Sequence, residues 1–360
     1  MLVLYLGTSS FILWLIIALL PWRPWSTRER LNADPSIQLD LSDITVLIPA
    51  RNEANIISKT LTAIVNQAND IPIIVVDDQS TDATRQTIEA SSNKQVTIIR
   101  GKPTATGWSG KLYALEQGRQ LINTPYTLLL DADIVLEPGT LATLKKKLQD
   151  NDLGLLSVMG KLNMYTVWYK LLMPAFIYFF KLLYPFHLSN KKTSRIAAAA
   201  GGCILLRTDI LNKIGGFTAI KDALIDDCSL ANSVKQHGYT TWTGLTHSAV
   251  SLRSYNHLSS IWLMVTRTAF TQLHYSYLLL MFCLALMLLA YVIPVMGIIF
   301  FSSLPQMLSV ISLLILLLLY LPTLVFYGVN PLWCITMPLA AVLYMIMTLD
   351  SAAKHCFGTG

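Results

Sequence analysis

Two aspartates, Asp131 and Asp133, stand on either side of Ala132, directly after the apolar run at residues 128–130. In an extended segment, residues i and i+2 point to the same side, so both carboxylates would face one ligand. Carboxylate oxygens suit Mg²⁺ or Mn²⁺, and such an ion would bridge a diphosphate and neutralise the charge of a leaving group. The alternative interpretation is a surface turn, because this short pattern is common.

A second acidic pair, Asp77 and Asp78, ends the β-branched run at residues 73–76. Ser80 or Asp82 can cap the helix that follows. Two adjacent carboxylates after a buried run are more than capping requires, and one of them could accept a hydrogen bond from a nucleobase N–H. The pattern therefore indicates a nucleotide site beside a helix cap.

Two basic residues are candidates for contacts with phosphate. Arg51 follows Pro49 at the end of the first apolar run, and a guanidinium can hold phosphate through two hydrogen bonds. The alternative there is a turn before an acidic helix start at Glu53. Lys111 ends a glycine-containing segment, residues 107–111, that lacks the earlier glycine and the final Ser/Thr of a P-loop. Lys111 could still approach a diphosphate, or it could simply be solvated.

Further along the chain, Gly201 and Gly202 precede another apolar run, and the pair Asp226–Asp227 opens a helical pattern. The glycines allow close backbone approach to a ligand, or only tight turns. A carboxylate at the start of a helix can act as general base for an acceptor hydroxyl. The alternative is a helix N-terminus that attracts anions through its dipole.

Strands and helices alternate around these residues, which predicts an α/β fold with a mostly parallel sheet. Ligands bind beyond the carboxyl ends of the strands in such sheets, where both acidic pairs would lie. We predict strands at 44–48, 71–76, 96–100 and 127–130, and helices at 53–66, 83–90 and 110–121.

The charged residues are confined to the middle of the chain. Of the 360 residues, 53% are hydrophobic and only 13% charged, whereas soluble domains have about 25% charged residues. Asp350 and Lys354 alone lie outside the segment from Arg23 to Arg267. The net charge of +6 suits an anionic membrane surface or a phosphate-rich substrate. Nucleic-acid binding is not expected, since no dense basic stripe interleaved with aromatics is present.

The two uncharged ends predict membrane segments. Residues 1–22 would form an N-terminal transmembrane anchor, and residues 278–349 would hold three spans, at 278–301, 308–327 and 333–349. A cleaved signal peptide is the rival for the N-terminus, but its basic start is missing. Arg23 and the flanking tryptophans favour a retained anchor whose exit is cytoplasmic. We expect an integral membrane protein of the bacterial inner membrane with its catalytic domain in the cytoplasm.

The middle divides into a polar linker at residues 23–42 and a catalytic domain at residues 43–267. Within the latter, residues 168–188 are apolar apart from Lys170 and Lys181, which share one helical face. We interpret this segment as a helix lying in the membrane interface with both lysines reaching the surface. The alternative is a buried core helix of the soluble domain.

Taken together and in this order, the segments at 48–54, 75–84, 131–133, 201–216 and 226–230 resemble glycosyltransferase family 2, of the GT-A-type fold. The resemblance covers residues 43–267. The segment 107–111, the pair Asp226–Asp227 and the layout of one anchor plus three spans are most similar to the hopene-associated membrane glycosyltransferase subfamily.

The resemblance implies an inverting transferase that uses a nucleotide sugar and a divalent metal, Mg²⁺ or Mn²⁺. Asp78 would contact the nucleobase, Glu53 would lie near the nucleoside, and Asp131 and Asp133 would hold metal and diphosphate. Asp227 matches the family's catalytic base. The family usually has Glu-Asp at that place, so Asp226 replaces the Glu, and it stays open which carboxylate acts.

Three functions follow as hypotheses. The first is transfer of one sugar to a membrane lipid, with a hopanoid suggested by the resemblance. The second is a processive polysaccharide synthase, but the Q-x-x-R-W signature is absent, since Trp262 and Arg267 lack that spacing. The third is a non-catalytic scaffold or a transporter. Residues 268–349 contain no Asp, Glu, Lys or Arg, which argues against ion coupling.

Overall fold

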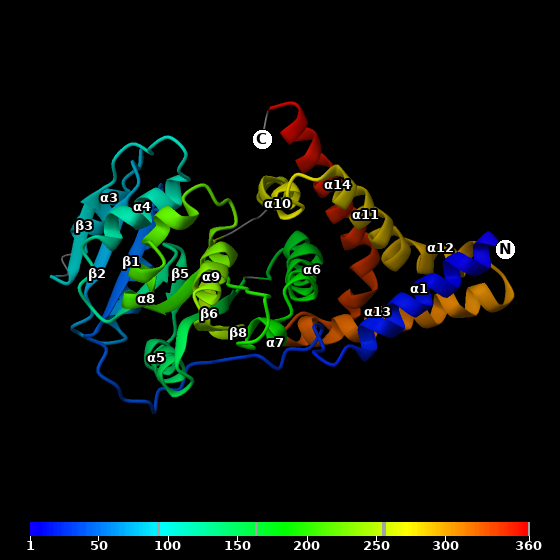
Figure 1. The fold of residues 1–360 in the computed structure, drawn as a ribbon, viewed down its shortest axis with the longest axis horizontal. Helices are drawn as coiled ribbons and strands as arrows, with labels where there is room; N and C mark the ends of the chain where they lie inside the picture. Colours follow the sequence, from blue (N-terminus) through cyan, green and yellow to red (C-terminus); the bar gives the residue numbers. More distant parts are fainter. Residues whose placement is uncertain (92–93, 163, 254–256, 359–360) are drawn as a thin grey trace. The chain divides into compact units, whose positions relative to one another are not determined.

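The computed structural model describes residues 1–91, 94–162, 164–253 and 257–358 (Figure 1). The chain forms two compact units. The helical unit consists of Met1–Thr27, Met164–Pro185 and Ser254–Gly360, and the α/β unit consists of Arg28–Asn163 and Phe186–Arg253. The candidate residues of the sequence all belong to the α/β unit.

The α/β unit is built on one eight-stranded sheet with the order β3-β2-β1-β4-β7-β6-β8-β5. Strands β3, β2, β1 and β4 are parallel, β7 is antiparallel to both of its neighbours, and β5 is antiparallel to β8. The strands are β1 (Ile44–Ala50), β2 (Ile73–Asp77), β3 (Val96–Arg100), β4 (Tyr126–Leu130), β5 (Ile134–Leu136), β6 (Leu153–Lys161), β7 (Cys203–Arg207) and β8 (Thr240–Ser251).

Two apolar cores cover the two faces of this sheet. Successive side chains of a strand point to opposite faces, so Ile48 and Val46 pack into one core while Leu47 packs into the other. Helices α2 and α5 contribute to the first core, and α4, α8 and α9 contribute to the second. The helices of this unit are α2 (Ile57–Val65), α3 (Thr84–Ala90), α4 (Gly110–Arg119), α5 (Thr140–Asp150), α7 (Phe186–Ser189), α8 (Thr208–Lys213), η1 (Gly216–Ile220) and α9 (Asp226–Gln236).

The predicted α/β fold with a mostly parallel sheet is confirmed, and each expected strand and helix before residue 131 is present with shifted ends. Residues 28–42 differ from the linker expected there. The Leu31 N–H donates to the Leu245 carbonyl at 2.9 Å, and the Leu245 N–H donates to the Glu29 carbonyl at 2.8 Å. This segment therefore runs beside β8 as part of the α/β unit.

The helical unit contains four helices that are long and apolar enough to cross a membrane, as predicted: Leu2–Leu19, Tyr277–Phe300, Ser303–Phe326 and Pro331–Cys356. They comprise α1 (Leu2–Leu19), α11 (Tyr277–Met287) with η2 (Leu288–Val292) and α12 (Ile293–Phe300), α13 (Ser303–Phe326), and η3 (Pro331–Thr336) with α14 (Met337–Cys356). The last helix continues beyond the expected end at residue 349. It includes Asp350, which pairs with Lys354 at 2.9 Å and accepts from the Trp262 indole at 2.6 Å.

The second candidate span contains a π-helical turn, η2, directly before Pro294. Pro294 has no N–H to offer the Ala290 carbonyl one turn earlier. The Trp14 indole of α1 donates to that carbonyl at 2.7 Å, and Trp14 itself is fully buried. Helix α1 is thereby bonded to the C-terminal helices of its own unit.

Two further helices belong to the helical unit, α6 (Val167–Leu183) and α10 (Leu258–Gln272). The expectation that both lysines of α6 reach the surface is wrong for Lys181, which is 1% exposed. Its ammonium donates to the Thr323 hydroxyl at 2.9 Å and to the Ser26 carbonyl at 3.2 Å. These oxygens replace the water that a surface lysine would have. The placement of α6 in a membrane interface stays a prediction.

Candidate active site

The candidate residues gather where the strands of the sheet end. Strands β1, β2 and β4 are parallel, so the loops that follow them leave from one edge. Strand β7 starts at that same edge, because it is antiparallel to β4 and Cys203 lies opposite Leu130. The segments after β1, β2 and β4 and the glycines before β7 therefore meet beyond this edge, as expected for a ligand site.

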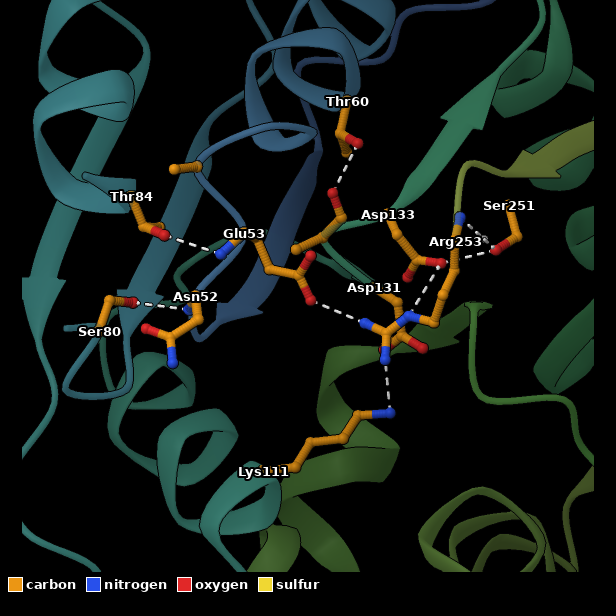
Figure 2. Close-up of polar contacts among 12 residues, drawn as sticks. Asn52, Glu53, Thr60, Ser80, Thr84, Lys111, Asp131, Asp133, Ser251 and Arg253 are labelled. Atoms are coloured by element: carbon orange, nitrogen blue, oxygen red, sulfur yellow. Dashed lines mark hydrogen bonds and ion pairs between the residues drawn. The ribbon is translucent and has the colours of Figure 1, made fainter. Parts of the chain in front are cut away.

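The loops after β1 and β2 brace each other. The Asn52 side-chain oxygen accepts from the Thr81 N–H at 2.8 Å, and the Asn52 N–H donates to the Ser80 hydroxyl at 3.0 Å. The Glu53 N–H donates to the Thr84 hydroxyl at 2.7 Å. Figure 2 shows the last two of these contacts. The two loops thus form one hydrogen-bonded platform that carries the candidate side chains Arg51, Glu53 and Asp78.

Arg51 faces Asp78 on this platform. Their side chains form an ion pair at 3.6 Å, with Arg51 largely exposed and Asp78 buried. Burial, supported by the neighbouring Asp77, raises the pKa of the Asp78 carboxyl, and Arg51 opposes that rise. A Cβ at Gly110 would lie only 3.3 Å from Asp78 Oδ2, so this carboxylate packs closely against the start of α4.

The turn that carries Asp131 and Asp133 is held from several sides. The buried Thr60 hydroxyl of α2 donates to the Ala132 carbonyl at 2.7 Å (Figure 2). The Asp131 N–H donates to the Gly202 carbonyl at 3.1 Å, and the Asp133 carbonyl accepts from the Leu252 N–H at 2.8 Å. These three contacts hold the backbone of the turn, and none of them involves a carboxylate oxygen of Asp131 or Asp133.

Lys111 connects the first of these aspartates to the pair at the start of α9. Its ammonium lies 2.9 Å from Asp131 Oδ1 and 3.3 Å from Asp226 Oδ2. Burial disfavours the charge of Lys111, but Asp131 and Asp226 outweigh it and raise the pKa of the ammonium. Burial also raises the pKa of Asp131, against the effect of Lys111. Lys111 is therefore not simply solvated; it links Asp131 after β4 to Asp226 at the start of α9.

Asp133 faces a different cation, Arg253, which follows β8. Arg253 Nη2 lies 2.7 Å from Glu53 Oε1, and its Nε lies 3.6 Å from Asp133 Oδ2 (Figure 2). The Ser251 hydroxyl donates to the same Asp133 oxygen at 2.6 Å. Burial raises the pKa of the Glu53 carboxyl, whereas Arg253 lowers it. The sequence did not single out Arg253, because no recognisable motif surrounds it; only the threonine-rich run of β8 before it signals a strand end.

Asp227 lies in the first turn of α9. Its Oδ1 accepts from the Cys228 N–H at 2.7 Å, and a Cβ at Gly201 would lie 3.4 Å from its Oδ2. Burial, together with the neighbouring Asp226, raises the pKa of Asp227 to about 6. A carboxyl with this pKa is largely ionised near neutral pH and is still basic enough to take up a proton.

A pocket in the α/β unit is lined by some of the site residues predicted from the sequence. It is lined by Pro49, Lys111, Asp131, Gly201, Asp226 and Asp227, with apolar side chains of α4 and η1 beneath. Arg51, Glu53, Asp78 and Asp133 lie outside this lining, in the three ion pairs described above. Gly202 packs against Ile134, where a Cβ would lie 3.1 Å from its Cδ1. A substituent at Gly202 would therefore meet the protein interior.

The site offers few side chains that could coordinate a metal ion. Among the residues that the structure describes, no three His, Cys, Asp or Glu side chains gather as a complete cation site. Mg²⁺ is commonly held by one or two carboxylates together with substrate phosphates. Asp131 and Asp133 at one strand end fit that mode of binding, and they do not fit a site made of protein ligands alone.

Residues 45–215 match the family model of glycosyl transferase family 2. The chain is 31% identical over 207 residues to the probable glycosyltransferase YdaM of Bacillus subtilis (strain 168), covering 56% of this chain and 48% of that protein. It is also 31% identical over 137 residues to the 4,4'-diaponeurosporenoate glycosyltransferase of Staphylococcus aureus (strain bovine RF122 / ET3-1), covering 37% and 36%. The matches thus span less than half of each relative's length.

Among solved structures, the chain is similar to the mannosyltransferase PcManGT from Pyrobaculum calidifontis, solved in complex with GDP-Man and Mn²⁺. The two share 17% identity with a TM-score of 0.58, over 99% of this chain and 100% of the other. At this identity the likeness concerns the fold. Residues 45–215 thus match glycosyl transferase family 2, and the fold of the α/β unit is GT-A-like.

Proposed function

We propose that this protein is a membrane-bound inverting glycosyltransferase that moves a single sugar from a nucleotide-sugar donor to a lipid acceptor at the cytoplasmic face. The observation that carries the proposal is the bridge made by Lys111. This ammonium joins Asp131 at the end of β4 to Asp226 at the start of α9, beside the buried Asp227. One pocket is thus lined both by Asp131, which would bind the metal and diphosphate of the donor, and by Asp227, which would take the proton of the acceptor.

On the donor side, Asp131 and Asp133 would hold a divalent ion, Mg²⁺ or Mn²⁺, and Lys111 would contact the diphosphate. When bound, the ion supplies positive charge that stabilises the departing diphosphate. Asp78 would accept from the nucleobase, with Arg51 holding its carboxylate and Glu53 near the nucleoside. Gly201, with Pro49 in the same pocket lining, would allow the donor to approach the backbone closely, whereas Gly202 packs against Ile134.

On the acceptor side, Asp227 would be the general base. Its carboxylate takes the proton of the acceptor hydroxyl while that oxygen forms a bond to the anomeric carbon. The bond from this carbon to the diphosphate oxygen breaks, and the nucleoside diphosphate leaves. Attack opposite to the leaving group inverts the configuration. Asp226 is paired with Lys111, which supports Asp227 as the residue that carries the proton.

The lipid acceptor is supported by two observations. In the part of the chain that the structure describes, four helices are long and apolar enough to cross a membrane, and one relative is named a 4,4'-diaponeurosporenoate glycosyltransferase. A hopanoid is the acceptor that the subfamily resemblance implies, and it belongs among the lipids to be tried first.

The test is transfer by the purified full-length protein. Radiolabelled nucleotide sugars are offered with extracted membrane lipids, with and without Mn²⁺, and the products are separated by chromatography. We expect metal-dependent label in a single lipid species. A ladder of longer products would instead identify a processive synthase, and the absence of both transfer and nucleotide binding would leave a scaffold as the better account.

A further inference from the structure

The position of Arg253 suggests how metal binding is controlled, which goes beyond the proposed function. The inference rests on that proposed function. Its guanidinium lies between two strand-end carboxylates, 2.7 Å from Glu53 Oε1 and 3.6 Å from Asp133 Oδ2 (Figure 2). Glu53 comes from the loop after β1 and Asp133 from the turn after β4. Arg253 therefore neutralises, from within the protein, a carboxylate assigned to the metal.

The same arrangement recurs at the other metal carboxylate. Lys111 lies 2.9 Å from Asp131, so each of the two aspartates has its own basic partner. A divalent ion that approaches Asp131 and Asp133 would come close to the Lys111 ammonium and the Arg253 guanidinium, which already pair with these carboxylates. Like charges this close repel strongly where water is partly excluded. An ion without its nucleotide must therefore displace cations that the protein already holds.

A donor changes this balance, because its diphosphate brings negative charge. A guanidinium and an ammonium that lose their carboxylate partners can pair with phosphate oxygens instead. Arg253 is suited to such an exchange, since its side chain is 46% exposed while that of Asp133 is 7% exposed. The Ser251 hydroxyl keeps Asp133 in place when Arg253 leaves, because it donates to the same carboxylate at 2.6 Å.

We propose that Arg253 is an internal counter-ion that blocks metal binding to Asp133 until the nucleotide arrives, so that metal and donor bind cooperatively. Arg253 is a positioning residue in this scheme. It holds Glu53 and Asp133 ready in the empty enzyme and passes to the diphosphate in the loaded one. The protein thereby avoids binding a free divalent cation in a site that lacks its substrate.

The experiment measures Mn²⁺ binding by electron paramagnetic resonance on the purified full-length protein, alone and with saturating UDP or GDP in separate arms. Wild type is expected to bind Mn²⁺ weakly alone and at least about tenfold more tightly with one nucleotide, which corresponds to about 1.4 kcal/mol. Arg253→Gln is expected to bind Mn²⁺ alone several-fold more tightly than wild type and to gain less from the nucleotide.

Two further variants separate this effect from a general change of charge. Arg253→Lys keeps the cation and should behave like wild type toward Mn²⁺ alone. Arg207→Gln removes a positive charge near the opposite end of the sheet, where Arg207 pairs with Asp209 and lies opposite Tyr126, and should leave Mn²⁺ binding unchanged.

The outcomes distinguish the inference from the proposed function. If wild type binds Mn²⁺ with a nucleotide but Arg253→Gln binds Mn²⁺ alone no better than wild type, the role of Arg253 is refuted and the transferase proposal stands. If no variant binds Mn²⁺ with either nucleotide, both the inference and the metal-dependent transferase proposal fail.

Discussion

Asp226 and Asp227 are adjacent in the chain, yet they meet different partners. Asp226 Oδ2 lies 3.3 Å from the Lys111 ammonium. Asp227 accepts a hydrogen bond from the Cys228 N–H, and its other oxygen lies beside Gly201 in the pocket. The sequence left open which carboxylate is the base. The geometry favours Asp227, because Asp226 already serves as the counter-ion of Lys111.

This difference leads to a prediction for the two conservative amide variants. Asp227→Asn removes the proton acceptor while keeping the size of the side chain, so we expect kcat to fall by about 10²–10⁴-fold with little change in nucleotide affinity. Asp226→Asn should lower kcat less, because Asp227 keeps its carboxylate and Lys111 keeps Asp131 as its partner. Transfer assays and nucleotide titrations of both variants decide the matter, and undiminished transfer by Asp227→Asn would refute the base assignment.

A pH profile probes the same residue without mutation. A base works only when ionised, and burial with the neighbouring Asp226 raises the pKa of Asp227 to about 6. Activity should therefore be full above that pKa, half-maximal near it, and fall about tenfold per pH unit below it. The measurement is kcat against pH at saturating donor, with the fold monitored by circular dichroism. An acidic limb at the ordinary aspartate pKa would contradict the role of the buried carboxyl.

At the scale of elements, the first half of the α/β unit could be read from the sequence. Its strands are short β-branched runs that alternate with amphipathic helices, and each acidic pair stands directly after a buried run. The hydrophobic pattern of a few neighbouring residues is enough to indicate such a strand or helix. For this reason the positions of Asp78 and Asp131 at strand ends were predictable.

The second half was not predictable in the same way. Strand β6 contains Gly154 and Gly160, and β8 carries buried threonines such as Thr241 and Thr243, so neither shows the usual apolar run. Their stability comes from partners far along the chain, since β8 pairs with both β6 and β5. Arg253 was missed for the same reason, because its meaning depends on Glu53 and Asp133, which only the fold brings near.

Helix α2 takes part in the site through one hydrogen bond, and this can be tested. Thr60→Val keeps the shape of the side chain but removes the hydroxyl that donates to the Ala132 carbonyl. A buried acceptor left without its partner costs about 1–3 kcal/mol. We expect a lower Tm and weaker Mn²⁺–nucleotide binding, because the turn holding Asp131 and Asp133 loses a support.

The matched control is Thr62→Val on the same helix. Thr62 is exposed, and its hydroxyl donates only to the Ser58 carbonyl one turn earlier. It should change neither Tm nor binding appreciably. Equal effects of the two substitutions would show that the contact with Ala132 does not position the aspartates.

At the scale of the whole molecule, the helical unit is more than a set of independent anchors. The Trp14 indole of α1 bonds to Ala290, and the Lys181 ammonium of α6 bonds to Thr323 of α13. The Tyr344 hydroxyl of α14 donates to the Leu172 carbonyl of α6 at 2.9 Å. Polar side chains inside an apolar unit are costly unless paired, so these contacts specify which helices pack together.

The distribution of basic residues predicts how the helical unit is oriented in the membrane. The loops between the C-terminal spans carry no basic residue, whereas Arg23, Arg28 and Arg30 follow α1 directly. Because basic residues stay on the cytoplasmic side, we predict that the α/β unit is cytoplasmic. One span before that unit and three after it would then place the exposed Cys356 outside.

Labelling with a membrane-impermeant maleimide tests both ends of this topology. Gln38→Cys in a background with Cys283, Cys334 and Cys356 changed to Ala introduces an exposed thiol in the α/β unit, while Cys203 and Cys228 are buried. This thiol should react in inside-out vesicles and not in right-side-out vesicles. Native Cys356, with Cys283 and Cys334 changed to Ala, should show the reverse. Reaction of the Gln38→Cys thiol only from the outside would overturn the cytoplasmic placement, because no nucleotide sugar made in the cytoplasm could then reach Asp131.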